Sequence, residues 1–373
     1  MKRSTAKYPD AIGYLIMIFL IFQLSGYPLW ALEGMLDLHD KARFVIWYVT
    51  LIISMAAGAV LQTAVHEAGH LVMGLLTGYR FVSYRIFSLM ILKDEDGRLK
   101  LKRLSVPGTL GQCLMAPPDY SDRFPFFLYN AGGVMFNLLT ALLFIASAFL
   151  VPFSWLKVLF SGVALSGILM ACTNGVPIKG AMAPNDGMNI LEMLVNRSSR
   201  YAFWVQMKVN EMLREGMRVG EIESEMLAGD SDTYRAGALG ASLVVYQENR
   251  FMDRHEYQEA DAVIEEGIQA NYPFAGFHRD YLLMDKITIN CINKRFSGTV
   301  DDRLAKLINN TKAPYALRCQ YAIAMYEKDF DRAKAIVSEM EKMKETYPFP
   351  RDFQSDLEIM DDLTRALSGE LPE

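Results

Sequence analysis

The chain has 373 residues, of which 51% are hydrophobic and 22% are charged, and its formal net charge is −5. This length allows two or three domains, and a negative net charge without any basic run excludes the usual nucleic-acid-binding classes. The first half of the chain is strongly apolar, whereas charge becomes dense from about Arg197 onward. We therefore expect a membrane-embedded half followed by a soluble half.

Four apolar segments in the first half are each long enough to cross a bilayer core of about 30 Å as a helix. They occupy residues 11–32, 44–78, 124–151 and 155–176. The first follows basic residues at the N-terminus, but it is longer than the apolar region of a signal peptide and lacks a small-residue cleavage site, so we interpret it as a retained helix. At about 1.5 Å per residue, the second would be roughly 50 Å long and must tilt, bend or project.

Basic residues predict the orientation of these segments. They concentrate near the N-terminus and in the loop 79–123, whereas the loop 33–43 carries only Lys41 and Arg43. Because Lys and Arg in short loops favour the cytoplasmic side, we expect both termini and the loop 79–123 to be cytoplasmic. The chain is thus predicted to be a multi-pass integral protein of the cell membrane, mainly α-helical, with about four spans.

The loop 79–123 has strand character. Residues 79–92 are rich in Val, Ile, Phe and Tyr, residues 93–97 carry a turn signal, and residues 98–104 alternate basic and apolar side chains. This pattern predicts a small membrane-associated β-hairpin. The apolar stretch 106–118 is punctuated by Pro and Gly and is too short to span a bilayer, so we expect it to dip into the membrane.

The fourth apolar segment is followed by an interruption. Pro177, Gly180 and Pro184 break the helical pattern, which resumes at residues 188–195. A broken backbone at membrane depth is stable only where it is buried in protein or lines a polar cavity. The interruption is therefore a candidate location for functional side chains.

Residues 197–373 are predicted to form a soluble α-helical domain. Three helix-pair patterns begin near Arg235, Phe277 and Pro314, a spacing of roughly 40 residues. Residues 257–262 and 329–333 resemble the second helix of tetratricopeptide repeats, although the middle pair lacks that pattern. A superhelical repeat domain and an ordinary small helical domain both remain open.

The cysteines indicate reduced thiols. None of the four takes part in a Cys-x-x-Cys pair, and they are scattered over both halves, at Cys113, Cys172, Cys291 and Cys319. This spacing does not suggest a disulfide framework. For Cys113 we favour a small buried apolar residue over a redox role.

The segment His66-Glu67-Ala68-Gly69-His70 has the pattern H-E-x-x-H. Positions i and i+4 of a helix lie on one face, so the two imidazoles can share one Zn²⁺ while Glu67 takes a proton from the metal-bound water. Ionisable side chains at membrane depth are costly and mark functional sites. We favour a catalytic zinc site over two alternatives: side chains that satisfy one another, and metal binding in a non-proteolytic protein.

A catalytic zinc site takes three protein ligands and keeps one position open. The candidates for the third ligand are Asp186, Glu192, Asp119 and Asp122. Asp186 lies in the helix interruption, where a short carboxylate can be aimed inward, whereas Asp119 and Asp122 are expected at the surface. The alternative for Asp186 is an N-cap of the helix that resumes after it.

These motifs resemble those of the site-2 protease family of intramembrane metalloproteases. The resemblance covers roughly residues 44–196 and rests on the H-E-x-x-H pattern, the strand-bearing loop, Gly133-x-x-x-Asn137, and Asn174-x-x-Pro177 followed by Asp186-Gly187. There are two departures. Val134 follows Gly133 where the family has proline, and eight residues, ending in Asn185 rather than leucine, separate Pro177 from Asp186.

The resemblance implies a three-helix catalytic core with zinc held by His66, His70 and Asp186. It also implies Glu67 as the base, and Asn137 and Asn174 as residues that hold the substrate backbone; interhelical hydrogen bonds are the alternative for the two asparagines. The expected organisation is an N-terminal span with an outer loop at residues 1–43, the protease core at 44–196, and the helical domain at 197–373.

The expected function is hydrolysis of peptide bonds in membrane-embedded or membrane-tethered substrates by a zinc-activated water. The family's substrate classes are membrane-tethered transcription regulators, signal-peptide remnants and pheromone precursors. A regulatory protein partner is expected at residues 197–373. The competing expectation is a membrane scaffold or receptor with a structural metal site.

Overall fold

The computed structural model describes residues 10–35, 39–93, 98–103, 110–344, 347 and 349–368. The chain forms two compact units, and the main boundary between them along the sequence lies between Val195 and Asn196. We call them the N-terminal unit and the C-terminal unit and describe each by itself. The terminal lysines and arginines used for the orientation, and residues 94–97 of the expected turn, lie outside the described residues.

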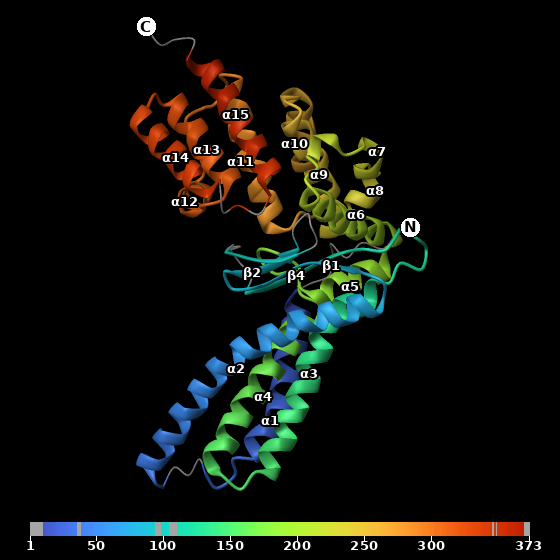
Figure 1. Ribbon diagram of the computed structural model, residues 1–373, viewed down its shortest axis with the longest axis vertical. Coiled ribbons are helices and arrows are strands. Elements are labelled where there is room, and N and C mark those ends of the chain that lie inside the picture. Colours follow the sequence, from blue (N-terminus) through green and yellow to red (C-terminus); the bar gives the residue numbers. More distant parts are fainter. Residues whose placement is uncertain are drawn as a thin grey trace. The chain divides into compact units, whose positions relative to one another are not determined.

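Four helices of the N-terminal unit are long and apolar enough to cross a membrane (Figure 1). They are α1 (Asp10–Trp30), α2 (Lys41–Leu76), α3 (Phe126–Leu150) and α4 (Ser154–Gly175). Each coincides with one of the four apolar segments of the sequence to within a few residues, which confirms them as helices. Their composition is that of a membrane protein.

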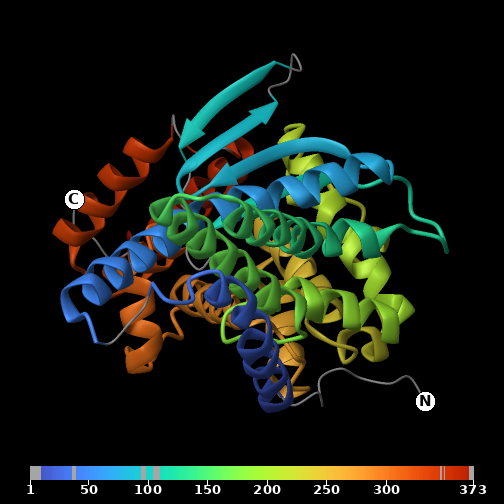
Figure 2. The same ribbon diagram turned by 90° about the horizontal axis from the view of Figure 1, so that it is seen from below.

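Small residues allow the helices of this unit to pack closely. A Cβ added at Gly69 of α2 would strike the backbone of Gly132 in α3, and the reverse also holds. Such close backbone approach is typical of helix packing within membranes. Helix α1 lies against α4 (Figure 2). Leu20 and Ile21 of α1 pack against a buried cluster that includes Ile168 and Cys172 of α4. Helices α2, α3 and α4 thus pack closely on one another, and α1 packs mainly on α4.

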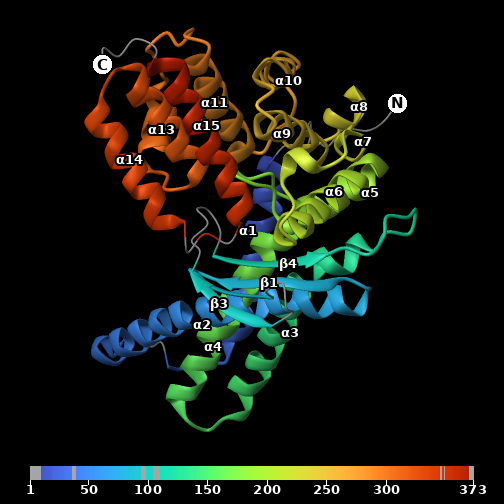
Figure 3. The ribbon, with the colours of Figure 1, turned by 45° about the horizontal axis from the view of Figure 1, so that its top comes forward.

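A four-stranded sheet follows α2 and packs against that helix (Figure 3). Its strands are β1 (Arg80–Ile86), β2 (Leu89–Lys93), β3 (Leu99–Arg103) and β4 (Gly111–Ala116), in the order β3-β2-β1-β4. Strand β1 is antiparallel to β2, with Ile86 opposite Leu89, and to β4, with Ile86 opposite Gly111. The Tyr84 hydroxyl donates to the Ala64 carbonyl at 2.6 Å and so ties β1 to α2.

The sheet corrects two sequence-based expectations. The run 79–92 is not one strand, because the chain turns at Phe87 and Ser88, and Phe87 has a positive φ of 51°. The stretch 106–118, which is predicted to dip into the membrane, contains strand β4 (Gly111–Ala116), which the sequence analysis does not predict. The predicted hairpin is therefore only part of a larger sheet.

The C-terminal unit consists of helices. They are α6 (Arg197–Arg214), η2 (Val219–Glu221), α7 (Ser224–Leu227), α8 (Ser231–Tyr234), α9 (Ala238–Asp253), α10 (Tyr257–Gln269), α11 (Gly276–Ile292), α12 (Asp302–Asn310), α13 (Pro314–Tyr326), α14 (Phe330–Met343) and α15 (Pro350–Ser368). The pairs α9–α10, α11–α12 and α13–α14 begin close to the three predicted starting points. The resemblance to tetratricopeptide repeats stays a prediction.

Five helices of this unit share one type of C-terminus. Helix α6 is followed by its cap, Glu215, and then by Gly216, whose φ is +87°. Helices α9, α10, α11 and α13 are each followed, one residue after the cap, by a residue with positive φ: His255, Asn271, Lys294 and Lys328. In each case the next N–H bonds a carbonyl five residues back, as in the Schellman motif. The same ending reverses the chain after both helices of the first pair and after the first helix of the other two.

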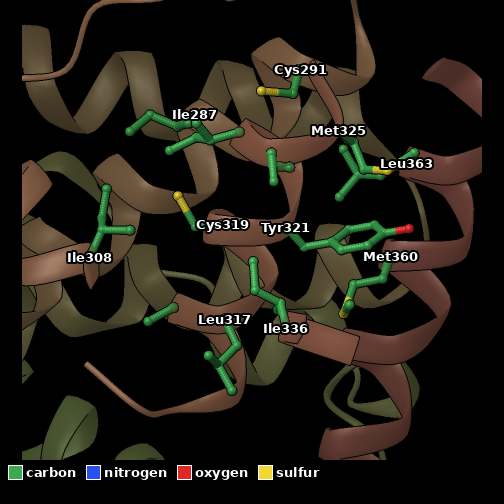
Figure 4. Close-up of a cluster of buried hydrophobic side chains, with 14 of the residues drawn as sticks. Ile287, Cys291, Ile308, Leu317, Cys319, Tyr321, Met325, Ile336, Met360 and Leu363 are labelled. Carbon is green, nitrogen blue, oxygen red and sulfur yellow. The ribbon is translucent and has the colours of Figure 1, made fainter. Parts of the chain in front are cut away.

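The main hydrophobic core of the C-terminal unit lies between α11, α13, α14 and α15 (Figure 4). Cys291 and Cys319 are fully buried in it, and Leu317 and Leu363 belong to the same cluster. All four cysteines of the chain are free and buried. Burial raises the pKa of the Cys113 thiol well above its usual range, which agrees with the interpretation of this cysteine as an apolar side chain.

Candidate metal centre

Helix α2 brings the two histidines of the motif together. His66, Glu67 and His70 are only 5%, 8% and 7% exposed. The Nε2 atoms of His66 and His70 lie 3.1 Å apart. One helical turn therefore presents both imidazoles to the same point, as the i, i+4 spacing predicts.

Asp186, the first residue of α5 (Asp186–Val195), reaches the same point from a distant part of the sequence. Its Oδ2 lies 3.0 Å from His66 Nε2 and 3.5 Å from His70 Nε2. Atoms bound about 2.0–2.1 Å from a tetrahedral zinc lie roughly 3.3–3.4 Å apart, so the separations fit such an ion. Within the described part of the chain, no other His, Cys, Asp or Glu side chains form such a group of three.

Hydrogen bonds fix the protonation of both imidazoles. His70 Nδ1 lies 2.7 Å from the carbonyl oxygen of Tyr129, which can only accept. His66 Nδ1 lies 2.7 Å from Asn137 Oδ1, and the Asn137 amide nitrogen donates to the Gln62 carbonyl at 2.9 Å and to Gln62 Oε1 at 2.8 Å. Each neutral imidazole therefore carries its proton on Nδ1 and its lone pair on Nε2.

Three electron-pair donors, from His66, His70 and Asp186, consequently converge at one buried point, which we call the metal point. Two Nε2 lone pairs face each other and a carboxylate oxygen, and none of the three can donate a hydrogen bond to another while the imidazoles are neutral. This arrangement is costly without a cation. The nitrogen and oxygen donors, their spacing and the outer hydrogen bonds match those of a catalytic zinc site.

Glu67 lies next to this point but is not one of the converging ligands. Its carboxylate accepts no hydrogen bond from any residue that the structure describes, yet it is close enough to His66, His70 and Asp186 for electrostatic interaction. A Cβ added at Gly111 would lie 2.5 Å from Glu67 Oε1, so the start of β4 covers the carboxylate. Glu67 is thus placed to accept a proton beside the metal point.

Arg85 is a charged residue near the site that sequence reasoning used only as a marker of orientation. It is 1% exposed and donates to the carbonyls of Phe87 at 2.6 Å and Gly111 at 3.4 Å. Burial lowers the pKa of the Arg85 guanidinium, and the nearby Glu67 carboxylate raises it. Arg85 therefore holds the start of β4 and adds positive charge on the Glu67 side.

The two residues of the Gly133-x-x-x-Asn137 pattern both face His66. A Cβ at Gly133 would lie 2.5 Å from the imidazole, so only glycine leaves room for the ring. Asn137 is fully buried, and its amide is occupied by His66 and Gln62. These contacts support a role in orienting His66; the substrate-binding role stays a prediction.

Asn174 is not brought into the group. Its amide nitrogen donates to the carbonyl of Met170, one turn earlier in α4, at 3.0 Å. No hydrogen bond joins it to His66, His70 or Asp186 in the described part of the structure. Its predicted substrate-binding role remains untested by the geometry.

Asn185 lies directly before Asp186, and sequence reasoning noted it only as a departure from the family pattern. Its amide nitrogen donates to the carbonyls of Thr173 at 2.7 Å and Val176 at 2.6 Å, and its Oδ1 accepts the N–H groups of Ile178 at 3.1 Å and Met188 at 2.9 Å. Asn185 is therefore the N-cap of α5. The alternative that Asp186 fills this position is wrong, and its carboxylate is free for the metal point.

The other ligand candidates lie elsewhere. Asp119 and Asp122 are exposed, as expected. Glu192 is buried in α5 but does not belong to the group of three ligands. Of the four candidates, only Asp186 joins the two histidines.

No protein-family model, curated protein or solved structure matches this chain. The resemblance to site-2 proteases therefore rests on the motif residues alone. The geometry around His66, His70 and Asp186 provides a separate argument, because it does not depend on any relative.

Proposed function

We propose that this protein is a zinc metalloprotease that hydrolyses peptide bonds of substrates within or tethered to a membrane. The observation that carries the proposal is the convergence of His66, His70 and Asp186 on one point, with Glu67 beside it and free of hydrogen bonds from the described residues. Three ligands with a free carboxylate next to them are the composition of a hydrolytic zinc site.

Each residue has a defined part in the proposed reaction. Zinc bound by His66, His70 and Asp186 would supply an activated water and polarise the scissile carbonyl. Glu67 accepts the proton of the attacking water and later delivers it to the leaving amine. Asn137 and the Tyr129 carbonyl keep the imidazole lone pairs directed at the metal point.

The sheet supports a way of presenting the substrate. A helical substrate hides its carbonyls in hydrogen bonds and must unwind before cleavage. Strand β4 is an end strand of the described sheet, and its first residue, Gly111, lies against Glu67. We propose that the unwound segment pairs with the β4 edge by strand addition, rather than with the outer hairpin 79–104 as a whole.

The remaining features of the proposal concern the setting. The four apolar helices are proposed to span the cell membrane with both termini in the cytoplasm, because basic residues concentrate in the loop 79–123. The C-terminal unit is proposed to select substrates or to bind a regulatory protein. The substrate classes are those of the family: a membrane-tethered transcription regulator, a signal-peptide remnant or a pheromone precursor.

The second candidate function is a membrane scaffold or receptor with a structural metal. Structural zinc sites are generally closed by four protein ligands, whereas three are present among the described residues. A structural site also has no use for a buried carboxylate that stands beside the ligands. These two features favour the protease.

Glu67→Gln separates the two functions. Gln keeps the shape of the side chain but cannot take a proton, so we expect normal zinc content and a loss of proteolysis of about 100-fold or more. Zinc content is measured on the purified protein, and substrates are found by comparing membrane peptides of cells that carry the wild type or Glu67→Gln. Unchanged cleavage by pure Glu67→Gln protein would exclude the hydrolase.

A further inference from the structure

Asp186 is held by an irregular segment that we call the arc, residues 176–185, between α4 and α5. The arc contains Gly180, whose φ of +66° disfavours other residues, and its residues 180–183 are exposed. Its two ends are joined, because Ile178 N–H donates to Asn185 Oδ1 and Asn185 N–H donates to the Ile178 carbonyl, both at 3.1 Å. The position of Asp186 therefore depends on the position of Ile178 and its neighbours.

Helix α1 holds the same part of the arc from outside. Asp10 Oδ1, at the start of α1, accepts the N–H of Lys179 at 3.0 Å. One turn later, a Cβ added at Gly13 would lie 2.6 Å from the Pro177 carbonyl oxygen and 3.1 Å from Ile178 Cγ1. Gly13 and Ile178 are both buried. Three successive residues of the arc, 177–179, thus rest on the first turn of α1.

We infer that α1 supports the metal centre. Asp10 and Gly13 are positioning residues that fix the arc, and the arc in turn fixes the third ligand, Asp186, through Asn185. The inference rests on the proposed metal site. Metal affinity depends on how well the ligands are held before the ion arrives, and outer contacts of this kind typically account for about 10–100-fold in affinity. The eight residues between Pro177 and Asp186 create the need for this support.

The inference extends the site beyond the catalytic core. The resemblance places the three catalytic helices within residues 44–196 and gives the first span no part in the site. Helix α1 would instead determine whether the chain holds its metal. A movement of α1 would then change metal occupancy without touching His66 or His70.

Two glycines of α1 provide a matched test. Gly13→Val places a side chain against the Pro177 carbonyl, whereas Gly26→Val meets open space, with no atom within 4 Å of the added Cβ. Both replacements change helix propensity equally. In full-length protein purified in detergent, we expect Gly13→Val to bind zinc about 10–100-fold more weakly in chelator competition, and Gly26→Val to stay within about twofold of the wild type.

Two milder substitutions at Asp10 control for misfolding. Asp10→Ala removes the acceptor for Lys179 N–H, whereas Asp10→Asn keeps an oxygen there, so Asn should restore most of the affinity that Ala loses. The absorption spectrum of the Co²⁺-loaded protein should change in Asp10→Ala and Gly13→Val, because the Asp186 carboxylate is displaced. A purely structural effect on stability would leave that spectrum unchanged.

A metal-free measurement follows the arc itself. The thiol introduced by Ala181→Cys is exposed, whereas the native cysteines are buried. Its labelling rate in metal-free protein should rise when Gly13→Val or Asp10→Ala is added, but not with Gly26→Val. Equal labelling rates and equal zinc affinities in all variants would refute the inferred role of α1 while leaving the proposed zinc site intact. Absence of zinc binding by the wild type would instead refute the proposed function, and the labelling difference would still report whether α1 holds the arc.

Discussion

Both units of the molecule bury charged groups, but they neutralise them differently. In the C-terminal unit, Arg318 is 3% exposed and pairs with Asp285 and, at 2.8 Å, with Asp356. In the N-terminal unit, the only ion-pair partners of Asp186 among the described residues are His66 and His70. A buried charge without a partner is costly. The first cluster contains its own cation, whereas the second is proposed to take a metal ion from solution.

The arginine cluster, which surrounds Arg318 in the C-terminal unit, contains more carboxylates than cations. Protonation can neutralise the excess carboxylates. Burial raises the pKa of Asp356 to about 7 in spite of Arg318, and that of Asp352 to about 6. Glu248 is fully buried, and burial together with Asp285 raises its pKa well above the usual range. Excess carboxylates in a protein interior can therefore be neutralised by protonation, whereas the two imidazoles and the carboxylate at 3.0–3.5 Å have the composition of the proposed metal site.

The largest expected effect comes from removing the third ligand. Asp186→Ala should lose most of its zinc and all proteolysis, because two histidines from one helix hold zinc poorly. Zinc content of the purified protein and cleavage of a substrate are the measurements. Asp119→Ala, an exposed carboxylate outside the group, should match the wild type. Full zinc occupancy in Asp186→Ala would show that the N-terminal cluster does not need this carboxylate and would remove the contrast with Arg318.

The matching change in the other unit is Arg318→Met. It leaves Asp285 and Asp356 buried without their cation, which should destabilise the C-terminal unit by about 3–5 kcal/mol. Hydrogen exchange of α13 and α15 in the full-length protein measures this effect. Arg365→Met is the control, because the Arg365 side chain is 76% exposed in its pair with Asp362 and should contribute about 1 kcal/mol or less.

The same variant also tests the independence of the clusters. Zinc content should be unchanged in Arg318→Met, since none of its partners is a ligand of the metal centre. A loss of zinc together with native exchange protection in α2, α3 and α4 would contradict the view that the two clusters are independent of each other.

A smaller effect is expected from the residues that orient the imidazoles. Asn137→Ala removes the acceptor of His66 Nδ1, and we expect zinc affinity to fall about 10–100-fold. Asn174→Ala removes only a bond to its own helix and should leave affinity within about twofold. If Asn137→Ala kept full affinity but raised KM, the substrate-binding role inferred from the family would be the correct one.

Sequence reasoning identified the parts of the molecule that have a local signature. The four helices are long apolar runs, and His66 and His70 have the spacing of one helical turn. Strand β4 was missed because its sequence, Gly-Gln-Cys-Leu-Met-Ala, does not alternate polar and apolar residues. The turn at Phe87 was missed because a bulky residue with positive φ has no turn signal in the sequence.

The residues that support Asp186 could not have been predicted for a different reason. Asn185 was visible only as a departure from a pattern, and its four hydrogen bonds go to backbone groups of the arc and the helices at its ends. Asp10 and Lys179 are 169 residues apart in the sequence. Contacts of this range are set by the packing of α1 on α4, which no local pattern encodes.

The smallest expected effect concerns the pH dependence of the arginine cluster. Asp352 on α15 is partly buried and has no hydrogen bond or ion pair in the described part of the chain. Asp253 on α9 adds to the effect of burial on its pKa of about 6, whereas Arg318 and Arg218 lower that pKa. A carboxyl whose folded-state pKa is raised contributes stability below its unfolded pKa of about 4, and that contribution is lost as the pH rises through about 6.

Asp352→Asn should therefore stabilise the C-terminal unit more at pH 8 than at pH 5, by up to about 1.4 kcal/mol in total, because the difference levels off once the pH has passed the folded-state pKa of about 6. The comparison must be between variants, because burial lowers the pKa of His278 to about 4. Stability therefore rises with pH through His278, which opposes the loss of stability caused by the acids. Exchange protection of α15 at pH 5 and 8, corrected for intrinsic rates, gives the difference. Asp361→Asn, an exposed residue of the same helix, should show no pH-dependent change. A pH-independent effect of Asp352→Asn would mean that the arginines already neutralise this carboxylate, and the C-terminal cluster would then be complete without protons.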